Sequence, residues 1–554
     1  MPANGRKFVR VVKYLLAGVT VFCVSWIATV SEWNAGVRWT SSREMDSSVS
    51  TMRTIVAYSE QKQAEMDRPT PVTCDRLPVF PKLLKFNDSW SSNTSPQEWQ
   101  HVTGTRVSLY KAYYDERTSQ PYIRILAMFS GRNFSSSDTL FCQTRSLNPD
   151  NDSVEVVAAK PLEIWWHMWD ESSVQVHTPL LLSCPLTEPL NGPSVVSVVT
   201  QRCDNPTNAL QLGPDRVEKK NKRTFTICVK DMKFHKNIAQ SVIEWIEINK
   251  LLGIDKIDVY IDDITRTTEK VLMYYQSKGY VRLFHVPIKY KSDRSLWQRR
   301  RDHIITYNDC LYRNLEQSEF IVPLDIDEVI FPKITNTWSA LLTRLEDQGW
   351  DSTKYSSIII RNVFFFDFMQ ELDKYKSVKY ESVKTKIYAK RDDVRIKKLS
   401  SNLEIGEIEL VNCSNINIEV IDNNFNNKTN NIHEKYKLRC GSDIPKPKII
   451  SNIISSAIIS PVGDYSKSWM LTKKVLTAFN HYPLMSLDAS GFTGWSPPFK
   501  EVQLNHYKES CNTTVFEDCA RYGRRARIDT TALRLRRRLT FALANTICTP
   551  LNNI

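Results

Sequence analysis

The segment from Thr224 to Glu328 alternates between strand patterns and helix patterns, and this alternation limits the folds that the chain can adopt. Short apolar or alternating runs predict strands at residues 225–230, 256–262, 280–287 and 319–328. Amphipathic segments between them predict helices at residues 238–253, 267–279 and 296–315. Strand–helix repeats of this kind form parallel sheets with right-handed crossovers. The sequence therefore predicts an α/β fold with a mostly parallel central sheet.

Carboxylates follow several of the predicted strands. Asp325 and Asp327, with Glu328, come where the fourth strand (EFIVPLDIDE) emerges from an apolar run. Three more acids lie after the first and second strands, namely Asp231, Asp262 and Asp263. Ligands of parallel α/β sheets bind outside the carboxyl ends of the strands. We therefore expect this edge to bind a ligand, with Asp231, Asp262, Asp263 and Asp325 among the residues that contact a nucleotide.

The Asp-x-Asp triplet alone is weak evidence, because chance supplies roughly one in a chain this long. Asp150-Asn151-Asp152 is such a chance triplet and is typical of a solvated turn. Asp325 and Asp327 differ because they follow a buried strand, where both can turn toward one hard cation such as Mn²⁺ or Mg²⁺. A divalent ion there would offset the charge of a departing nucleotide diphosphate.

A haloacid-dehalogenase-type phosphatase is an alternative, with Asp325 as nucleophile and Asp327 as acid/base. Such enzymes usually begin with the acid-bearing strand, whereas three strand–helix units precede it here. No clear G-D-x-x-x-D follows downstream. The sequence therefore favours a metal-dependent nucleotide-sugar transferase over the phosphatase.

Seven ordered motifs resemble glycosyltransferase family 92 in its animal form. They are FTICVKDM (225–232), VIEWIEINKLLGIDKIDVYIDD (242–263), NDCLYRN (308–314), LDIDEVIFP (324–332), FFFDF (364–368), VLTAFNHYPL (475–484) and VQLNHYKESC (502–511). The similarity extends over roughly residues 105–520. It implies a GT-A fold, Golgi residence and inverting transfer from a UDP-sugar. In characterised members galactose is passed to a glycan in β linkage.

The resemblance also implies roles for particular residues. Asp325 and Asp327 would bind the metal and the UDP diphosphate, with His506 or His481 as a third metal ligand. Inverting transfer further needs a base for the acceptor hydroxyl, and the candidate is Asp367, which ends the apolar strand SSIIIRNVFFF. Lys467 and Lys508 are candidate phosphate contacts. A catalytically inactive glycan- or nucleotide-binding protein with the same fold is the alternative from another functional class.

The N-terminus predicts a type II signal anchor. Four basic residues in 1–13 precede an uncharged run at 14–30, which is about 26 Å long as a helix at ~1.5 Å per residue. Basic flanks stay cytoplasmic, so residues 1–13 form a cytoplasmic tail and the rest is lumenal. A cleaved signal peptide is the alternative, but no clear small-x-small cleavage site precedes Val30. The predicted location is the Golgi membrane.

Eleven of the twelve Cys lie beyond this anchor and are scattered, a pattern that favours disulfides over zinc. Sequons are compatible with a lumenal protein and occur at Asn87, Asn93, Asn133, Asn151, Asn412, Asn427 and Asn512. A net charge of +13 is compatible with nucleic-acid binding, but a lumenal address argues against it. The expected partners are thus a UDP-sugar, a glycan or glycoprotein acceptor and the membrane, with a homodimer possible.

The remaining segments predict further domains. Polar residues 31–73 are typical of a stem, and short strand patterns at 74–215 predict a β-rich lumenal domain. The transferase domain is expected at 224–520, interrupted by an Asn-rich insertion at about 400–437. A basic C-terminal helix or tail, with a solvated basic face, is expected at 521–554.

Overall fold

The computed structural model describes most of the chain from residue 74 onward. The described residues are 74–83, 89–91, 93–95, 98–132, 134, 139–148, 153–165, 176–212, 222–289, 294–370, 447–487, 494–511 and 519–548. The predicted tail, membrane span and stem lie outside these residues, as does the Asn-rich insertion. Among the residues that are described, no helix combines the length and apolarity needed to cross a bilayer.

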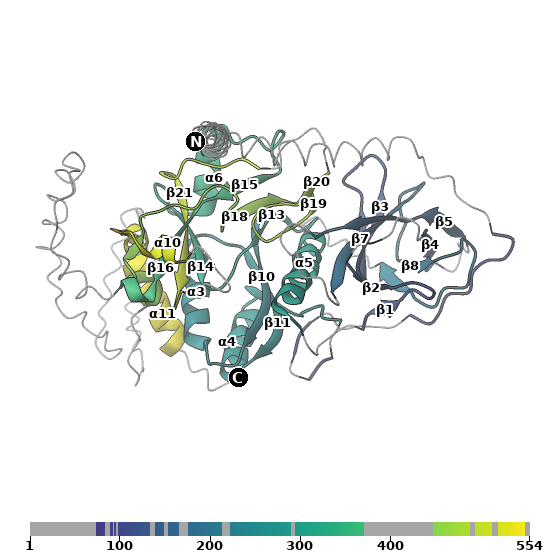
Figure 1. The fold of residues 1–554 in the computed structure, drawn as a ribbon, viewed down its shortest axis with the longest axis horizontal. Coiled ribbons are helices and arrows are strands. Elements are labelled where there is room, and N and C mark those ends of the chain that lie inside the picture. The colour runs from purple at the N-terminus through teal and green to yellow at the C-terminus, as the bar shows by residue number, and fades with distance from the viewer. Residues whose placement is uncertain are drawn as a thin grey trace, which may run out of the picture. The chain divides into compact units, whose positions relative to one another are not determined.

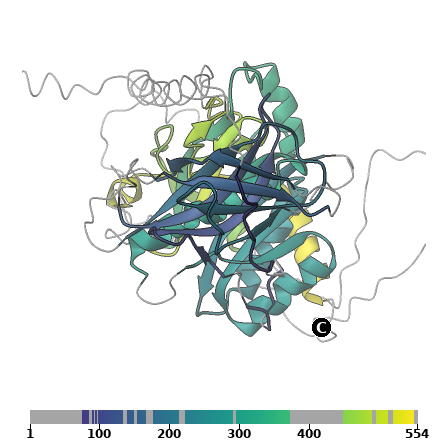
Figure 2. The same ribbon diagram turned by 90° about the vertical axis from the view of Figure 1, so that its right-hand side faces the viewer.

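The β-rich part consists of two antiparallel sheets, which lie in front in Figure 2. The five-stranded sheet has the order β1(Gln100–His101), β2(Val107–Asp115), β3(Tyr122–Ser130), β7(His177–Pro185), β6(Lys160–Glu163). The four-stranded sheet has the order β5(Val154–Ala158), β4(Phe141–Ser146), β8(Ser194–Val199), β9(Leu210–Leu212). Apolar side chains from both sheets form one buried cluster.

The central sheet has six strands and is mixed (Figure 1). Its order is β12(Val281–His285), β11(Lys256–Ile264), β10(Arg223–Phe234), β13(Ser318–Pro323), β18(Lys467–Leu471), β15(Ser357–Ile360). The first four strands are parallel to one another, as the sequence predicts. β18 runs antiparallel to both of its neighbours. The predicted α/β class is therefore confirmed, with the parallel strands confined to one side of the sheet.

Three helices connect the parallel strands, close to their predicted positions: α3(Ala239–Leu251), α4(Arg266–Ser277) and α5(Leu296–Arg313). The hydroxyl of Thr265 accepts the backbone N–H of Thr268 and so caps α4, a typical start signal. Gly253 and Gly279 follow α3 and α4 with φ of 85° and 71°. Glycine adopts this left-handed conformation without strain, which explains why both helices end there.

The two faces of the central sheet bury different helices. Side chains of β10 and β11 on one face, including Ile227 and Val259, pack with α3 and α4. On the other face, Tyr260 and Ile321 pack with α5 and with residues of the β-rich part such as Tyr113. α5 therefore lies between the central sheet and the β-rich part, and it contacts both β10 and β7.

A second, three-stranded sheet has the order β14(Glu328–Pro332), β21(Val502–Lys508), β16(Asn362–Phe366). β21 is antiparallel to β14 and parallel to β16. The run SSIIIRNVFFF, predicted as one strand, is in fact two strands in different sheets, β15 and β16. The prediction is wrong because both halves are apolar and buried, and only tertiary pairing separates them at Arg361.

The rest of the described chain forms shorter elements and one longer C-terminal helix: α6(Trp338–Glu346), η2(Asp367–Met369), α9(Lys448–Ser451), β17(Ile454–Ser456), β19(Val475–Thr477), β20(Met485–Ser486), α10(Cys519–Gly523), β22(Ala526–Ile528), η3(Thr531–Leu535) and α11(Arg536–Cys548). The predicted C-terminal helix therefore begins only at Arg536, because β22 pairs with β17 before it. Arg536, Arg537 and Arg538 are exposed, as expected of a solvated basic face.

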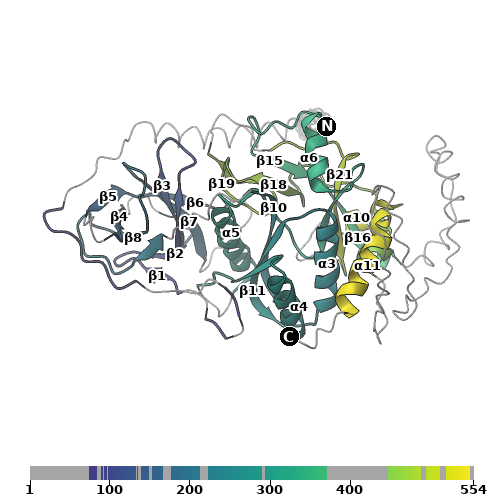
Figure 3. The same ribbon diagram turned by 180° about the vertical axis from the view of Figure 1, so that it is seen from behind.

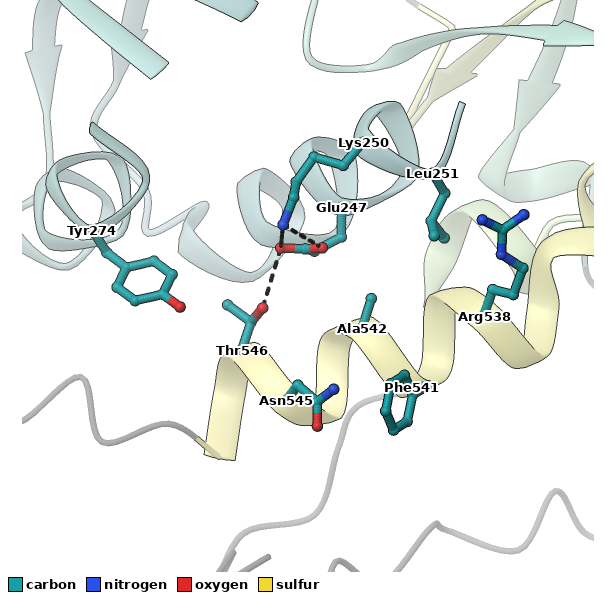
Figure 4. A pocket seen from close by; sticks show the side chains of 9 residues that line it. All are labelled: Glu247, Lys250, Leu251, Tyr274, Arg538, Phe541, Ala542, Asn545 and Thr546. Carbon is teal, nitrogen blue, oxygen red and sulfur yellow. Dashed lines mark hydrogen bonds and ion pairs between the residues drawn. The ribbon is translucent and has the colours of Figure 1, made fainter. Parts of the chain in front are cut away.

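α11 packs against α3, and the two lie side by side in Figure 3. The hydroxyl of Thr546 donates to the buried carboxylate of Glu247, which also accepts from Lys250. A pocket of about 420 Å³ lies at this junction, lined in part by Phe541 and Arg538 (Figure 4). α3 runs back from the carboxyl end of β10, so its last turn, and this pocket, lie toward the opposite edge of the sheet from the predicted carboxylates.

Four disulfides are described: Cys74–Cys203, Cys142–Cys184, Cys228–Cys310 and Cys511–Cys519. The preference for disulfides over zinc is thus confirmed for these eight residues. Cys228–Cys310 links β10 to α5, and Cys511–Cys519 closes the segment that follows β21.

Candidate active site

The order of the strands in the central sheet changes direction between β10 and β13. β10 is followed in the sheet by β11 and β12 on one side, whereas β13 lies on its other side. The connections thus leave in opposite directions at the carboxyl ends of β10 and β13, which is where ligands bind in such sheets. Cys228 pairs with Pro323, so Lys230 and Asp325 each lie two residues beyond this last pair. The Lys230 ammonium donates to Asp325 Oδ2 at 2.9 Å.

The segment from Asp325 to Glu328 is a tight turn braced by its own acids. The Glu328 backbone N–H donates to the Asp325 carbonyl, and the Asp325 N–H donates to Glu328 Oε2, both at 3.0 Å. The Glu328 side chain is only 2% exposed. This buried carboxylate therefore holds the turn that carries Asp325 and Asp327.

Lys467 on β18 lies beneath this turn and is almost fully buried. Its ammonium is 3.4 Å from Asp325 Oδ2 and 3.3 Å from Glu328 Oε2, and it donates to Asn480 Oδ1 at 2.9 Å. Burial raises the pKa of Asp325, but Lys230 and Lys467 outweigh it and hold that pKa well below its usual range. Asp325 is therefore ionised and braced by two ammonium groups. Lys467 therefore lies next to Asp325, and its predicted contact with phosphate stays a prediction.

Asp327 meets the end of β21. Glu328 pairs with His506 in the three-stranded sheet, which brings the β21 side chains to the acidic turn. Asp327 Oδ2 is 3.4 Å from His506 Nε2 and 3.2 Å from the Lys508 ammonium. Partial burial raises the pKa of Asp327, and His506 and Lys508 lower it by more, so it lies below its usual range. Its side chain remains 38% exposed and so is open to a ligand.

His506 has buried ring nitrogens that make no hydrogen bond with good geometry. Nε2 faces Asp327 and Nδ1 faces Glu328, each at 3.4 Å. The ring stacks on Phe364, with centroids 5.2 Å apart. A buried imidazole with unbonded nitrogens beside a carboxylate fits the role of a metal ligand. A bound divalent cation would give both the imidazole and the carboxylate a partner.

The predicted metal needs oxygen or nitrogen ligands that meet at one point. Within the described ranges, no three His, Cys, Asp or Glu side chains are arranged to hold a metal ion together. Asp327 and His506 supply two adjacent donors, whereas the Asp325 oxygen is engaged by Lys230 and Lys467. Mg²⁺ and similar ions are often held by one or two side chains, with substrate phosphates and water as the other ligands. The residues thus fit a metal that binds together with a diphosphate.

His481, the alternative third ligand, has both ring nitrogens occupied. Nδ1 lies 2.7 Å from the Ser466 carbonyl, and Nε2 lies 3.0 Å from the Asn480 amide nitrogen. Burial lowers its pKa to about 3, so the ring is neutral. His481 orients Asn480, which in turn accepts from Lys467. The geometry therefore favours His506 over His481 as the ligand.

A second charged cluster lies at the ends of β10 and β11. The Arg294 guanidinium joins three acids, with contacts of 3.1 Å to Asp231, 3.0 Å to Asp262 and 2.7 Å to Asp302. Asp231 and Asp262 lie inside their strands rather than after them, because β10 continues through a bulge to Phe234. Burial raises the pKa of Asp302 to about 6.

The two carboxylate oxygens of Asp231 differ in their contacts. Oδ2 contacts Arg294, Arg299 and His303, the last at 3.1 Å, whereas the buried Oδ1 has no hydrogen-bond partner. Burial raises the pKa of Asp231, but these neighbours hold it below its usual range. Burial also lowers the pKa of His303 to about 4. Asp231 therefore offers an ionised acceptor close to Lys230.

Two predicted residues lie farther out. Asp263 pairs with His235 at 3.4 Å, and its side chain is 59% exposed. Asp367 begins η2 and contacts Lys448 at 2.8 Å and Asn452 at 3.3 Å. Asp367 follows Phe366, which pairs with Lys508 in the three-stranded sheet. Asp367 therefore shares the Asp327 end of that sheet, whereas Asp263 is a solvated surface acid.

Sequence patterns do not point to Lys230, Arg294 and His303. Lys230 ends the predicted first strand, and a charged residue at that position is a signal of the carboxyl end. The run RRRDH predicts only helix, yet it carries His303, which contacts Asp231. Together these residues add positive charge around the carboxylates, an arrangement that suits a polyanionic ligand such as a diphosphate.

Comparison with known proteins agrees with this location. A profile of Glycosyltransferase family 92 matches residues 223–535, which begin with β10 and include every residue of the two clusters. Beta-1,4-galactosyltransferase galt-1 of Caenorhabditis elegans is 23% identical over 239 residues, which cover 41% of this chain. The match spans about half of that relative, 51% of its length.

Proposed function

Since the chain belongs to glycosyltransferase family 92, we propose that it transfers a hexose, with galactose favoured, from a UDP-sugar to a glycan acceptor with inversion. The observation that carries this proposal is the ionised pair Asp325 and Asp327, set among Lys230, Lys467 and Lys508 beyond the carboxyl ends of β10 and β13. Family membership also removes the basis for the phosphatase alternative. The order of the parallel strands supports a GT-A arrangement, in which the donor nucleotide occupies this edge.

The donor would bind across the two clusters. Lys230 and Lys467 lie where they can neutralise diphosphate oxygens, and both keep their charge because Asp325 raises their pKa against the effect of burial. Asp231 Oδ1, which has no hydrogen-bond partner in the protein, would accept a hydrogen bond from the nucleoside. Asp262 holds Arg294 in place for this task. These contacts position the sugar–phosphate bond at Asp327.

Mn²⁺ or Mg²⁺, held by Asp327 and His506, would supply Lewis-acid stabilisation of the departing diphosphate. Lys508, which contacts Asp327 at 3.2 Å, adds a positive charge on the same side. Asp325 acts differently in this proposal, because its ion pairs with Lys230 and Lys467 fix both ammonium groups. The chain thus divides the neutralisation of the diphosphate between fixed lysines and an exchangeable cation.

Asp367 is the proposed base that takes the acceptor hydroxyl proton. Its carboxylate is 39% exposed, and Lys448 pairs with it at 2.8 Å. A partly exposed carboxylate at the Asp327 end of the three-stranded sheet would receive this proton as the hydroxyl attacks the anomeric carbon from the side opposite the diphosphate. Lys448 and Asn452 would hold Asp367 in position.

The proposed location is the Golgi lumen, with the N-terminal segment as the membrane anchor. The four disulfides support an oxidising compartment. The glycan acceptor is proposed to be an N-glycan or a related structure.

The full chain, purified in detergent, is to be incubated with UDP-galactose, Mn²⁺ and N-glycan acceptors. Asp327→Ala should lower kcat by about 100- to 1000-fold, the usual loss when one charge-stabilising group is removed. Asp351→Ala is the matched control, because Asp351 pairs with Lys354 on the surface. Absence of both transfer and hydrolysis with every UDP-sugar would refute the proposal.

A metal-dependent thermal shift separates the enzyme from an inactive binding protein. Wild-type protein should be stabilised by a UDP-sugar only when Mn²⁺ is present, and Asp327→Ala should lose this effect. Stabilisation that needs no metal and survives Asp327→Ala would indicate a binding protein without turnover.

A further inference from the structure

Four aromatic rings form a continuous stack that begins in the candidate active site. His506 stacks on Phe364 with centroids 5.2 Å apart, Phe364 on Phe366 at 5.5 Å, and Phe366 on Phe368 at 5.1 Å. The planes of neighbouring rings differ by 29°, 13° and 21°. We call these four residues the ring stack.

The strand geometry explains the ring stack. Phe364 and Phe366 are alternate residues of β16, so they project from the same face, and Phe364 pairs directly with His506 of β21. Phe368 continues the series from η2, at the end of the strand. Phe364 and Phe366 are buried, whereas Phe368 is 41% exposed. The stack therefore runs from the proposed metal ligand to the protein surface.

The exposed ring is held firmly. A Cβ atom at Gly523 would lie 2.9 Å from Phe368 Cζ, so only glycine lets α10 approach the ring this closely. α10 begins at Cys519, whose disulfide to Cys511 connects it to the end of β21. Phe368 is thus fixed by Phe366 on one side and by α10 on another, while part of it faces solvent. A rigid exposed aromatic ring is a pre-organised binding surface.

Polar residues neighbour Phe368 in the chain and in the three-stranded sheet. Asp367, the proposed base, is the preceding residue, and Lys448 and Asn452 contact its carboxylate. Phe366 pairs with Lys508, which contacts Asp327. An apolar ring beside a charged and amide-rich rim suits a ligand with one apolar face and many hydroxyl groups. A pyranose has these properties, since its C–H face matches the negative face of an aromatic ring.

We propose that Phe368 is the stacking platform for the acceptor, and that it binds the terminal pyranose of a neutral glycan next to Asp367. The inference rests on the proposed function and adds the part of the site that receives the acceptor. The ring stack makes the position of the acceptor sugar depend on the same strand pair that carries His506, Lys508 and Asp367. The same pair of strands would therefore position both the acceptor and the donor.

Steady-state kinetics of the full chain test this role. Phe368→Ala should raise the acceptor KM by about three- to tenfold, the value of one stacking contact, while the donor KM stays within about twofold. Phe368→Leu should raise the acceptor KM as well, because leucine keeps most of the apolar area but lacks the ring face. Phe541→Ala is the control, since Phe541 is similarly exposed, at 44%, but lies on α11.

The outcomes are distinguishable from failure of the proposed function. An unchanged acceptor KM in Phe368→Ala, or full rescue by Phe368→Leu, would overturn the platform. Equal increases in donor and acceptor KM would also overturn it, because they indicate a structural role. If wild-type protein shows no turnover, binding of an N-glycan alone decides: loss of binding in Phe368→Ala but not in Phe541→Ala supports the platform, and absence of binding to wild type overturns it.

Discussion

The candidate active site and the interior around Asp309 both contain buried carboxylates, but the contacts of those carboxylates differ. Asp309 on α5 is fully buried, and its oxygens accept hydrogen bonds from Tyr113, from Tyr260 at 2.5 Å and from Arg313 at 2.5 Å. These partners come from the β-rich part, from the central sheet and from α5 itself. The Asp309 carboxylate therefore links the β-rich part, the central sheet and α5 through hydrogen bonds.

At the carboxyl edge the contacts are longer and incomplete. Asp327 meets His506 and Lys508 at 3.4 Å and 3.2 Å, the nitrogens of His506 lack good hydrogen bonds, and one oxygen of Asp231 has no partner. Buried polar groups in folded proteins are normally satisfied, so a concentration of open groups marks a place completed by a ligand. The Asp309 network joins three parts of the fold, whereas the open groups at the edge are those that the proposed donor and metal would contact.

The largest expected effect on stability is at Asp309. Asp309→Ala should lower the free energy of unfolding by about 3–5 kcal/mol, because it leaves the Arg313 charge and two tyrosine hydroxyls without their acceptor. Urea unfolding of the full chain measures this. The control is Asp263→Ala, a solvated acid whose removal should change stability by less than about 0.5 kcal/mol. Equal effects at the two positions would show that the Asp309 network is not a fold determinant.

A smaller loss is expected from Lys467→Met, which tests whether the edge is also partly structural. The pKa of Asp325 lies below its usual range, so this ion pair stabilises the protein above the usual Asp pKa and ceases to do so as pH falls. The substitution should cost about 2–3 kcal/mol in unfolding free energy at pH 7. The difference from wild type should stay nearly constant from pH 7 to about pH 4, close to the usual Asp pKa, and should shrink on further acidification to about pH 2, as measured by urea unfolding.

The exposed Lys473 provides the matched control for this substitution. Lys473→Met should leave the unfolding free energy nearly unchanged at each pH value. A difference between Lys467→Met and wild type that stays constant with pH would show that lost packing, rather than lost charge, is responsible.

The smallest expected effect concerns Glu244, a buried acid held by neutral donors. Its carboxylate accepts the backbone N–H groups of Lys448 and Ile449, and burial raises its pKa to about 7. A raised pKa means that the folded state binds the proton more tightly, so this group stabilises at low pH and less as pH rises through 7. Wild-type unfolding free energy should therefore fall by about 2 kcal/mol from pH 5 to pH 7 through this group.

Glu244→Gln should remove this pH-dependent part, because glutamine does not titrate. Unfolding free energies of the variant and of wild type, measured at pH 5, 6 and 7, provide the test. Parallel pH profiles would show that Glu244 keeps an ordinary pKa. Glu269, which lies in the first turn of α4, is the control acid, and Glu269→Gln should leave the wild-type profile unchanged.

The local part of this architecture could be predicted from the sequence. The strand and helix patterns of 225–328 place Asp325 at the end of a buried strand, and the Gly residues after α3 and α4 mark the helix ends. These features depend on side chains close together in sequence. The sequence predicts that the first strand ends at Lys230, whereas β10 continues to Phe234. A bulge with charged residues breaks the alternation that identifies a strand.

The non-local part could not be predicted. β21 lies between β14 and β16 although it comes more than 130 residues after both, and only this pairing brings His506 to Asp327. Arg294 precedes α5 in a loop, and its three acid partners belong to β10, β11 and α5. Periodicity contains no information on such contacts, so motif resemblance alone pointed to His506, and nothing pointed to Arg294.

The Cys228–Cys310 bridge links the strand that carries Lys230 and Asp231 to the helix that carries Arg299 and His303. The two halves of the proposed donor pocket are consequently joined by a covalent bond that forms only under oxidising conditions. Preparations from the bacterial cytosol, or assays run with thiol reductants, would lack this restraint and understate activity. Expression in the secretory pathway of eukaryotic cells is therefore the appropriate source of protein for every measurement above.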